Sequence, residues 1–294
     1  MQLAFVDGIR TGATPGGRGE CPNCGAPVVA KCGPRVLHHW AHKGRRDCDP
    51  RWENETEWHR AWKSLFPVEC REISHVAPDG ELHRVDIRTP TGIYIEIQHS
   101  SMTDAERTSR EDFYRNLIWV IDGRGFRNNF DIYHMLPDPG SELARDLVWE
   151  KATRPMKGAT HGIFYRLSRN RDHHPDATKA TLRGGWIEGI HTIQGEVEAN
   201  YRGHHQFDWV RPHRTWLATG FPVYIDFGDD VLVKLETYDE SGLRCIRVVT
   251  KRKFMRDVMV ETDATAVATR FYPFSDQISA PNELDLSQLP FCLE

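Results

Sequence analysis

Long apolar runs are missing from this chain of 294 residues. No stretch of about 18 consecutive apolar residues occurs, so no membrane-spanning helix and no membrane partner are expected. The opening residues, MQLAFVDGIRTGATPGG, also lack the basic start and the apolar centre of a secretory signal. The sequence therefore predicts a cytoplasmic protein.

An excess of basic residues is also absent, since the formal net charge at pH 7 is −4. Bulk positive charge cannot attract nucleic acid here, so any such binding requires local patches. Two basic patches occur, and solvated surface charge is the alternative interpretation of each. They consist of Lys31, Arg35, Lys43, Arg45, Arg46 and Arg51, and of Arg244, Arg247, Lys251, Arg252, Lys253 and Arg256.

The cysteines are too few and too unevenly placed for a disulfide framework. The chain has seven of them, an odd number, and no secretory signal precedes them. Four lie within the first fifty residues, where histidines are also frequent. This concentration points to a metal site in the N-terminal segment.

Cys21 and Cys24 form a CPNC motif, the spacing at which a tight turn presents two thiolates to one metal ion. A closed tetrahedral zinc site needs two more ligands, for which we favour His42 and Cys48, with His39 as the substitute. A redox CxxC is one alternative, but no thioredoxin-like βαβ pattern surrounds it. Buried free thiols are the other alternative, but a segment this polar needs a bound metal ion or a cross-link to become ordered. We therefore predict a structural zinc site.

Hydrophobic periodicity predicts an α/β core after this segment. Residues 53–66 have a helical pattern, residues 68–75 are predicted to form a strand, and residues 83–100 are predicted to form a hairpin. Residues 103–116 predict a helix that begins with a capping box, and LIWVID at residues 117–122 predicts a strand buried on both faces. The order of helix, three strands, helix and strand is typical of a mixed sheet.

The later part of the chain has weaker patterns. Residues 141–153 are compatible with a helix, and residues 166–185 are polar and rich in turn formers. RTWLAT, PVYIDFG, VLVKLETY and CIRVVTK alternate as strands of a small antiparallel meander. We expect four segments: an N-terminal module (1–50), an α/β core (51–135), a helical and loop-rich connection (136–213) and a β-rich C-terminal region (214–294).

The hairpin carries two acids whose placement depends on its register. If Thr89 and Ile93 close a three-residue turn, Asp86 stands directly opposite Glu96. Opposed carboxylates repel each other, and a divalent ion relieves the repulsion, since Mg²⁺ accepts one or two carboxylates and keeps its other positions for water and phosphate. The alternatives are an exposed amphipathic ribbon and a two-residue turn, which would separate the pair.

The helix before the hairpin adds further polar groups. Glu55, His59 and Lys63 have i, i+4, i+8 spacing and would share one helical face. Taken alone, they would be interpreted as a surface ladder of favourable charge pairs. Their position directly before the acidic hairpin suggests that they belong to the same site.

Six motifs in this order resemble the competence protein CoiA-like nucleases, a branch of the PD-(D/E)XK restriction-endonuclease-like superfamily. They are CPNC, HHWAH, ETEWH with Lys63, HRVDI, IEIQHS and SREDFYRNLIWVID, and they cover roughly residues 20–123. The resemblance implies a zinc-ribbon-like module followed by a restriction-endonuclease-like mixed sheet flanked by helices.

The resemblance also implies roles for individual residues. Glu55 matches the helix acid of the superfamily, Asp86 the strand acid and Glu96 the second acid. Gln98 stands where the superfamily usually has lysine, although CoiA-like sequences commonly show this E-x-Q form. Glutamine is neutral and can only hydrogen-bond, so Lys63 or His59 is our hypothesis for the missing cation.

Two residues of the second helix are candidates for contact with nucleic acid. Arg110 and Tyr114, at i and i+4, match a helix where related nucleases place polar residues near the site. Arg110 could contact a phosphate. Ordinary packing on the helix surface is the alternative for both residues.

The sequence and the resemblance together predict a Mg²⁺- or Mn²⁺-dependent deoxyribonuclease with a structural zinc ion. Its expected partner is DNA, single- or double-stranded, and its process would be uptake-linked recombination, repair or defence. A homodimer and partner proteins of recombination or defence are left open. The alternatives are a degenerate nuclease that only binds DNA and a zinc-stabilised protein-interaction module.

Overall fold

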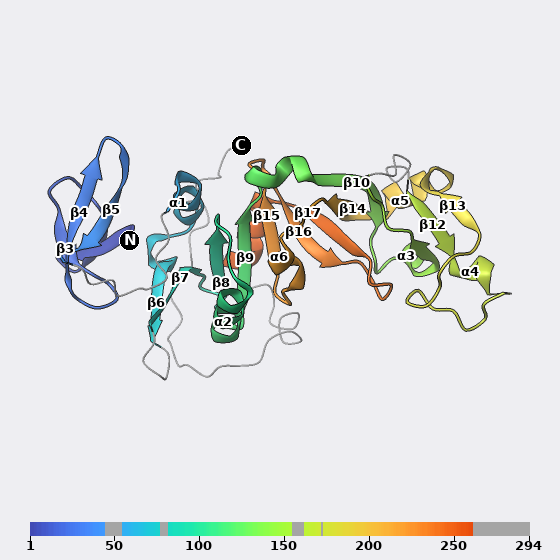
Figure 1. The fold of residues 1–294 in the computed structure, drawn as a ribbon, viewed down its shortest axis with the longest axis horizontal. Helices are drawn as coiled ribbons and strands as arrows, with labels where there is room; N and C mark the ends of the chain where they lie inside the picture. Colours follow the sequence, from blue (N-terminus) through green and yellow to red (C-terminus); the bar gives the residue numbers. More distant parts are fainter. Residues whose placement is uncertain (45–54, 77–81, 155–161, 172, 261–294) are drawn as a thin grey trace. The chain divides into compact units, whose positions relative to one another are not determined.

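The computed structural model describes residues 1–44, 55–76, 82–154, 162–171 and 173–260, so Cys48 and the end of the expected β-rich region, residues 261–294, lie outside the described residues. The fold is mixed α/β with several sheets (Figure 1). Two compact units divide the chain. Unit 1 contains Met1–Ser101, Thr108–Ile118 and Arg256–Glu294, and unit 2 contains Met102–Arg107 and Trp119–Met255.

The N-terminal part of unit 1 is an antiparallel five-stranded sheet with the order β2-β1-β3-β4-β5. Its small core is built from Met1, Ala4, Cys21, Val28 and Trp40. These strands are short and carry many half-buried polar residues. Their bounds are Leu3–Val6 (β1), Ile9–Gly12 (β2), Arg18–Glu20 (β3), Pro27–Gly33 (β4) and Val36–His42 (β5).

The second part of unit 1 follows the predicted order of elements. Helix α1 (Glu57–Ser64) and a short 3₁₀ turn, η1 (Val68–Cys70), precede β6 (Arg71–Val76), β7 (Leu82–Arg88) and β8 (Tyr94–Gln98). Strand β7 pairs antiparallel with both β6 and β8. Next along the chain come helix α2 (Asp104–Tyr114), which begins in unit 2, and β9 (Leu117–Asp122), most of which belongs to unit 2. The Thr103 hydroxyl accepts the predicted capping bond from the Glu106 amide.

Helix α1 is shorter than predicted. Its N-cap is Thr56, whose hydroxyl accepts a hydrogen bond from the His59 amide, so Glu55 lies before the helix. The expectation that Glu55, His59 and Lys63 share one helical face was therefore wrong for Glu55. His59 and Lys63 do share the buried face with Trp58 and Trp62.

The predicted hairpin register is confirmed. Ile87 pairs with Ile95, and the Thr89 amide donates to the Ile93 carbonyl at 2.9 Å. Gly92 has a φ of 77°, which a residue with a side chain rarely adopts. The apolar face of the ribbon is at most 1% exposed at Val85, Ile87, Ile95 and Ile97. The core thus fixes the register, since a one-residue slip would expose this face.

Unit 2 contains a six-stranded run with the order β10-β14-β17-β16-β15-β9. Strands β15 and β9 are parallel, whereas the pairs β10–β14, β14–β17, β17–β16 and β16–β15 are antiparallel, so the sheet is mixed. The strands not yet given are Phe130–Pro137 (β10), Tyr201–Trp209 (β14), Val223–Asp226 (β15), Val231–Thr237 (β16) and Arg244–Thr250 (β17).

A three-stranded sheet, β11 (Leu147–Trp149), β12 (Ile163–Arg166) and β13 (Ile187–Gly189), completes unit 2. Its core includes Leu136, Trp149, Phe164 and Val197. Short helices connect the strands: η2 (Arg124–Asn129), α3 (Glu142–Asp146), α4 (Leu167–Asn170), η4 (Ile190–Thr192), α5 (Gln194–Ala199) and α6 (Arg214–Ala218), with α7 (Lys251–Met259) after β17.

Two sequence predictions in unit 2 were wrong. The segment RTWLAT forms helix α6 rather than a strand, because six residues with one buried aromatic, Trp216, cannot distinguish helical from alternating periodicity. The helix expected over residues 141–153 ends at Asp146, and the buried residues Leu147, Val148 and Trp149 pair with β12 instead. Among the helices in the described ranges, none is long and apolar enough to cross a membrane.

Candidate functional site

Three carboxylates form a row across the strands β6, β7 and β8. The pairs Arg71–Ile87 and Ile73–Val85 place Glu72 opposite Asp86, and the register through Ile87–Ile95 places Asp86 opposite Glu96. Because side chains alternate along a strand, the three acids project from one face of the sheet, opposite to the apolar face. Asp86 therefore faces Glu96 on one neighbouring strand, as predicted, and Glu72 on the other.

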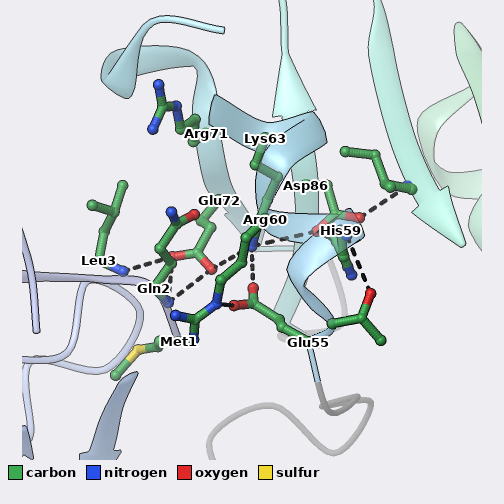
Figure 2. Close-up of polar contacts among 12 residues, drawn as sticks. Met1, Gln2, Leu3, Glu55, His59, Arg60, Lys63, Arg71, Glu72 and Asp86 are labelled. Atoms are coloured by element: carbon green, nitrogen blue, oxygen red, sulfur yellow. Dashed lines mark hydrogen bonds and ion pairs between the residues drawn. The ribbon is translucent and has the colours of Figure 1, made fainter. Parts of the chain in front are cut away.

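Lys63 of α1 lies beside two of these acids, Glu72 and Asp86 (Figure 2). Its side chain is 1% exposed, and its ammonium pairs with Glu55 and lies 2.9 Å from Glu72 Oε1 and 3.9 Å from Asp86 Oδ1. Burial alone would lower the pKa of Lys63, but Glu72, Glu55 and Asp86 outweigh it and raise the pKa above its usual range. Lys63 is therefore a permanent cation at the row of acids.

His59 of α1 pairs with Asp86. The His59 Nε2 lies 2.9 Å from Asp86 Oδ1, and the other oxygen of Asp86 accepts a hydrogen bond from the Ile97 amide at 3.0 Å. Burial would raise the pKa of Asp86, but His59 and Lys63 hold it well below its usual range. For His59, burial is outweighed by Asp86, which raises its pKa. Asp86 is thus ionised in the folded protein.

Glu96 has a different electrostatic environment. It is 3% exposed, and burial raises its pKa to about 8, against the opposing effect of Arg110 and with the help of the Asp86 charge. Arg110 Nη1 donates to Glu96 Oε2 at 3.0 Å. The two facing acids therefore differ in the pH at which they ionise, because only Asp86 has both a strong cationic partner and a backbone donor.

The remaining candidates also lie near this face. Gln98 is buried, and its amide donates to Ser100 Oγ at 2.9 Å and to the Ser100 carbonyl at 3.2 Å. Arg110 and Tyr114 are 9% and 4% exposed, so both candidates for nucleic-acid contact are buried. Burial and the nearby Glu96 raise the pKa of Tyr114, whose hydroxyl lies in the interior.

Glu72 was missed by the sequence analysis. It lies in the predicted strand of residues 68–75, but nothing in that strand marked it until its pairing partner in β7 was known. Its carboxylate also accepts two backbone hydrogen bonds from the N-terminal module, at 3.0 Å from the Leu3 amide at the start of β1 and 3.1 Å from the preceding Gln2 amide (Figure 2). Only a register between β6 and β7 could have identified it.

The metal ligands predicted in the N-terminal module come together in part. Ligand atoms of Cys21, Cys24 and His42 all lie within 4.8 Å of one another, and Cys24 Sγ is 3.3 Å from His42 Nε2. The Gly25 amide donates to the Cys21 carbonyl at 2.9 Å, which closes the turn between the two thiols. His39 instead directs Nδ1 to the Leu37 carbonyl at 2.8 Å. These three residues could hold a metal ion such as zinc.

Within the described ranges, this is the one set of three or more potential ligands from His, Cys, Asp or Glu that lies so close together. The acidic row does not form such a set, and its carboxylates are each paired with a cation or a backbone donor. Two facing carboxylates can still bind Mg²⁺, which takes its other ligands from water and substrate. No family model, curated protein or solved structure matches the chain.

Proposed function

We propose that unit 1 is a restriction-endonuclease-like core that hydrolyses phosphodiester bonds in DNA with the help of Mg²⁺ or Mn²⁺. The observation that carries this proposal is the facing of Asp86 and Glu96 on adjacent strands, with Glu55 and Lys63 in the same cluster. The resemblance to CoiA-like nucleases implies an acid on the first helix and two strand acids, and Lys63 adds the cation that Gln98 does not supply.

The residues supply distinct functions in this proposal. Asp86 and Glu96 would hold the divalent ion, which when bound lowers the pKa of water and neutralises phosphate charge. Lys63 keeps a positive charge beside Asp86 at any working pH. It would supply the charge of the lysine that the superfamily usually has at the position of Gln98. Gln98 would position a water or a phosphate oxygen through its amide. Glu55 keeps Lys63 in place and completes the acidic set.

A DNA-binding protein without catalysis is the second candidate. The existing pairs favour it, because Asp86 is bound to His59 at 2.9 Å and Glu96 to Arg110 at 3.0 Å. A divalent ion must displace or share these cations, whereas a protein that only binds DNA needs no such exchange. The two candidates therefore differ in whether a metal ion competes for the carboxylates.

Cleavage that depends on pH and on metal tests the proposal. Glu96 has a pKa of about 8, so below pH 8 its carboxyl is protonated and a divalent ion must displace the proton. We expect the apparent affinity for Mg²⁺ to rise roughly tenfold per pH unit between pH 6 and 8 and to level off above. The measurement is cleavage of labelled single- and double-stranded DNA across a Mg²⁺ titration at each pH.

The variant Glu96→Gln is expected to remove this pH dependence and to weaken Mg²⁺ binding. Glu57→Gln, an exposed acid in the first turn of α1, is the control and should behave like the wild type. DNA binding without cleavage at any Mg²⁺ or Mn²⁺ concentration would instead support the second candidate.

We also propose that the Cys21–Cys24–His42 set holds a structural zinc ion, with Cys48 as the fourth ligand. The purified protein is then expected to contain about one zinc per chain, and Cys24→Ser to lose most of it. Cys32→Ser is the matched control, because Cys32 lies in β4 outside the set. The measurement is the zinc content per chain of the wild type and both variants by elemental analysis. A wild type that is purified without zinc would contradict the prediction.

A further inference from the structure

Glu72 contacts both parts of unit 1 with one carboxylate. Its Oε1 atom lies 2.9 Å from the Lys63 ammonium, and its oxygens accept the amides of Gln2 and Leu3 at 3.0–3.2 Å. Figure 2 shows the side chain between Lys63 and the backbone of the N-terminal module. The side chain is 4% exposed, so these partners take the place of water.

The backbone at Glu72 is also held in an unusual state. Its φ is +49°, in the left-handed region that residues with a β-carbon rarely adopt. Such a conformation costs free energy and persists only where the surrounding contacts determine it. One of these contacts is made by Arg10 of β2, whose guanidinium donates to the carbonyls of Glu72 at 3.1 Å and Arg71 at 2.7 Å.

A second connection runs in parallel from the module to α1. The Arg60 guanidinium donates to the His38 carbonyl of β5 at 2.6 Å and to Glu55 Oε2 at 3.1 Å. Glu55 is the other acid that pairs with Lys63. The two carboxylates that fix the position of Lys63 are therefore both held by the N-terminal module, Glu72 through amides and Glu55 through Arg60.

We infer that the N-terminal module is a working part of the acidic site, and that Glu72 is the positioning residue through which it controls Lys63. When Glu72 is charged and held by β1, the Lys63 ammonium is shared between Glu72 and Glu55 and stays 3.9 Å from Asp86. If Glu72 loses its charge, Lys63 moves to Asp86 and competes with a divalent ion for it. This consequence for the metal rests on the proposed function, whereas the coupling of the two parts does not.

Amide hydrogen exchange tests the coupling without any assay of activity. Glu72→Gln keeps the shape of the side chain but removes its charge, so we expect at least about tenfold faster exchange of the Gln2 and Leu3 amides and of the amides at the end of α1. Glu69→Gln removes the same charge three residues earlier at an exposed position and should change neither group. Faster exchange of only one of these two groups of amides, or of neither group, would overturn the inference.

Metal titration then tests the effect on the site. We expect Glu72→Gln to raise the Mn²⁺ concentration for half-maximal cleavage about tenfold while the rate at saturation stays within about twofold, and Glu72→Asp to recover most of the affinity. A general loss of structure would lower the maximal rate instead, and equal titrations of variant and wild type would contradict the effect. If Glu72→Gln does not fold, Arg10→Gln, which removes the guanidinium bonds to the Glu72 and Arg71 carbonyls, carries both measurements, with smaller changes expected in the same direction. A wild type without cleavage but with coupled exchange would refute the proposed function and leave the coupling established.

Discussion

Replacing Asp86 by Asn is expected to lower DNA cleavage about a thousandfold at saturating Mg²⁺. The Asn side chain keeps an oxygen that can accept the Ile97 amide, which donates to Asp86 at 3.0 Å, so the strand pair should persist. The change removes the charge that faces Glu96 and that would hold the divalent ion in the proposed nuclease. The loss should therefore appear in the rate at saturation as well as in the metal affinity.

Asp112→Asn is the matched control for this prediction. Asp112 is an exposed acid of α2, in the same unit, and its substitution removes the same charge from the surface. We expect cleavage by this variant to match the wild type. Filter binding of DNA by both variants separates catalysis from binding, since Asp86→Asn should still bind DNA if basic residues make the contacts. Equal residual cleavage by Asp86→Asn and the wild type would exclude Asp86 from the chemistry.

The hairpin could be predicted from the sequence because two local signals agree. Gly92 supplies the positive φ that a three-residue turn needs, and the alternation of valine and isoleucine permits one register only. The facing of Asp86 and Glu96 follows from that register. The turn that joins Cys21 to Cys24 is equally local, and its closing bond from the Gly25 amide is a property of the spacing itself.

The sequence predicted that His59 and Lys63 share a site with these acids, but which acid each of them pairs with depends on how separate elements pack. Lys63 and His59 reach the row of acids only when α1 lies over it, and Glu72 joins the row only through the register of β6 with β7. Arg110 was expected to contact phosphate but pairs with Glu96 in the interior. The sequence of one segment identifies its charged side chains, but tertiary packing determines which of them form ion pairs.

Replacing Lys63 by Met is expected to cost about 3–5 kcal/mol of unfolding free energy. Lys63 is 1% exposed, and its removal leaves the buried carboxylates of Glu72 and Glu55 without their shared cation. Thermal unfolding should report this as a fall of roughly 10 °C in Tm. Lys43→Met, at an exposed position of the N-terminal module, is the control and should change stability by less than about 0.5 kcal/mol.

The dependence on pH identifies the cause of this loss. Burial would raise the pKa of Glu72, but Lys63 and Arg84 hold it well below its usual range. A carboxylate with a lowered pKa stabilises the fold above the pKa of the unfolded chain, near 4.3, and loses this contribution as the pH falls. The difference in stability between the wild type and Lys63→Met should thus be full at pH 7 and shrink in acid as Glu72 becomes protonated.

A double substitution tests whether the charge, rather than the packing of the lysine stem, is responsible. Lys63→Met combined with Glu72→Gln removes both partners of the 2.9 Å ion pair, so no uncompensated charge remains at Glu72. We expect the double variant to be more stable than Lys63→Met alone, with a coupling energy of about 1–3 kcal/mol. Additive losses would mean that Lys63 stabilises unit 1 through its packing, and that Glu72 would keep its position without it.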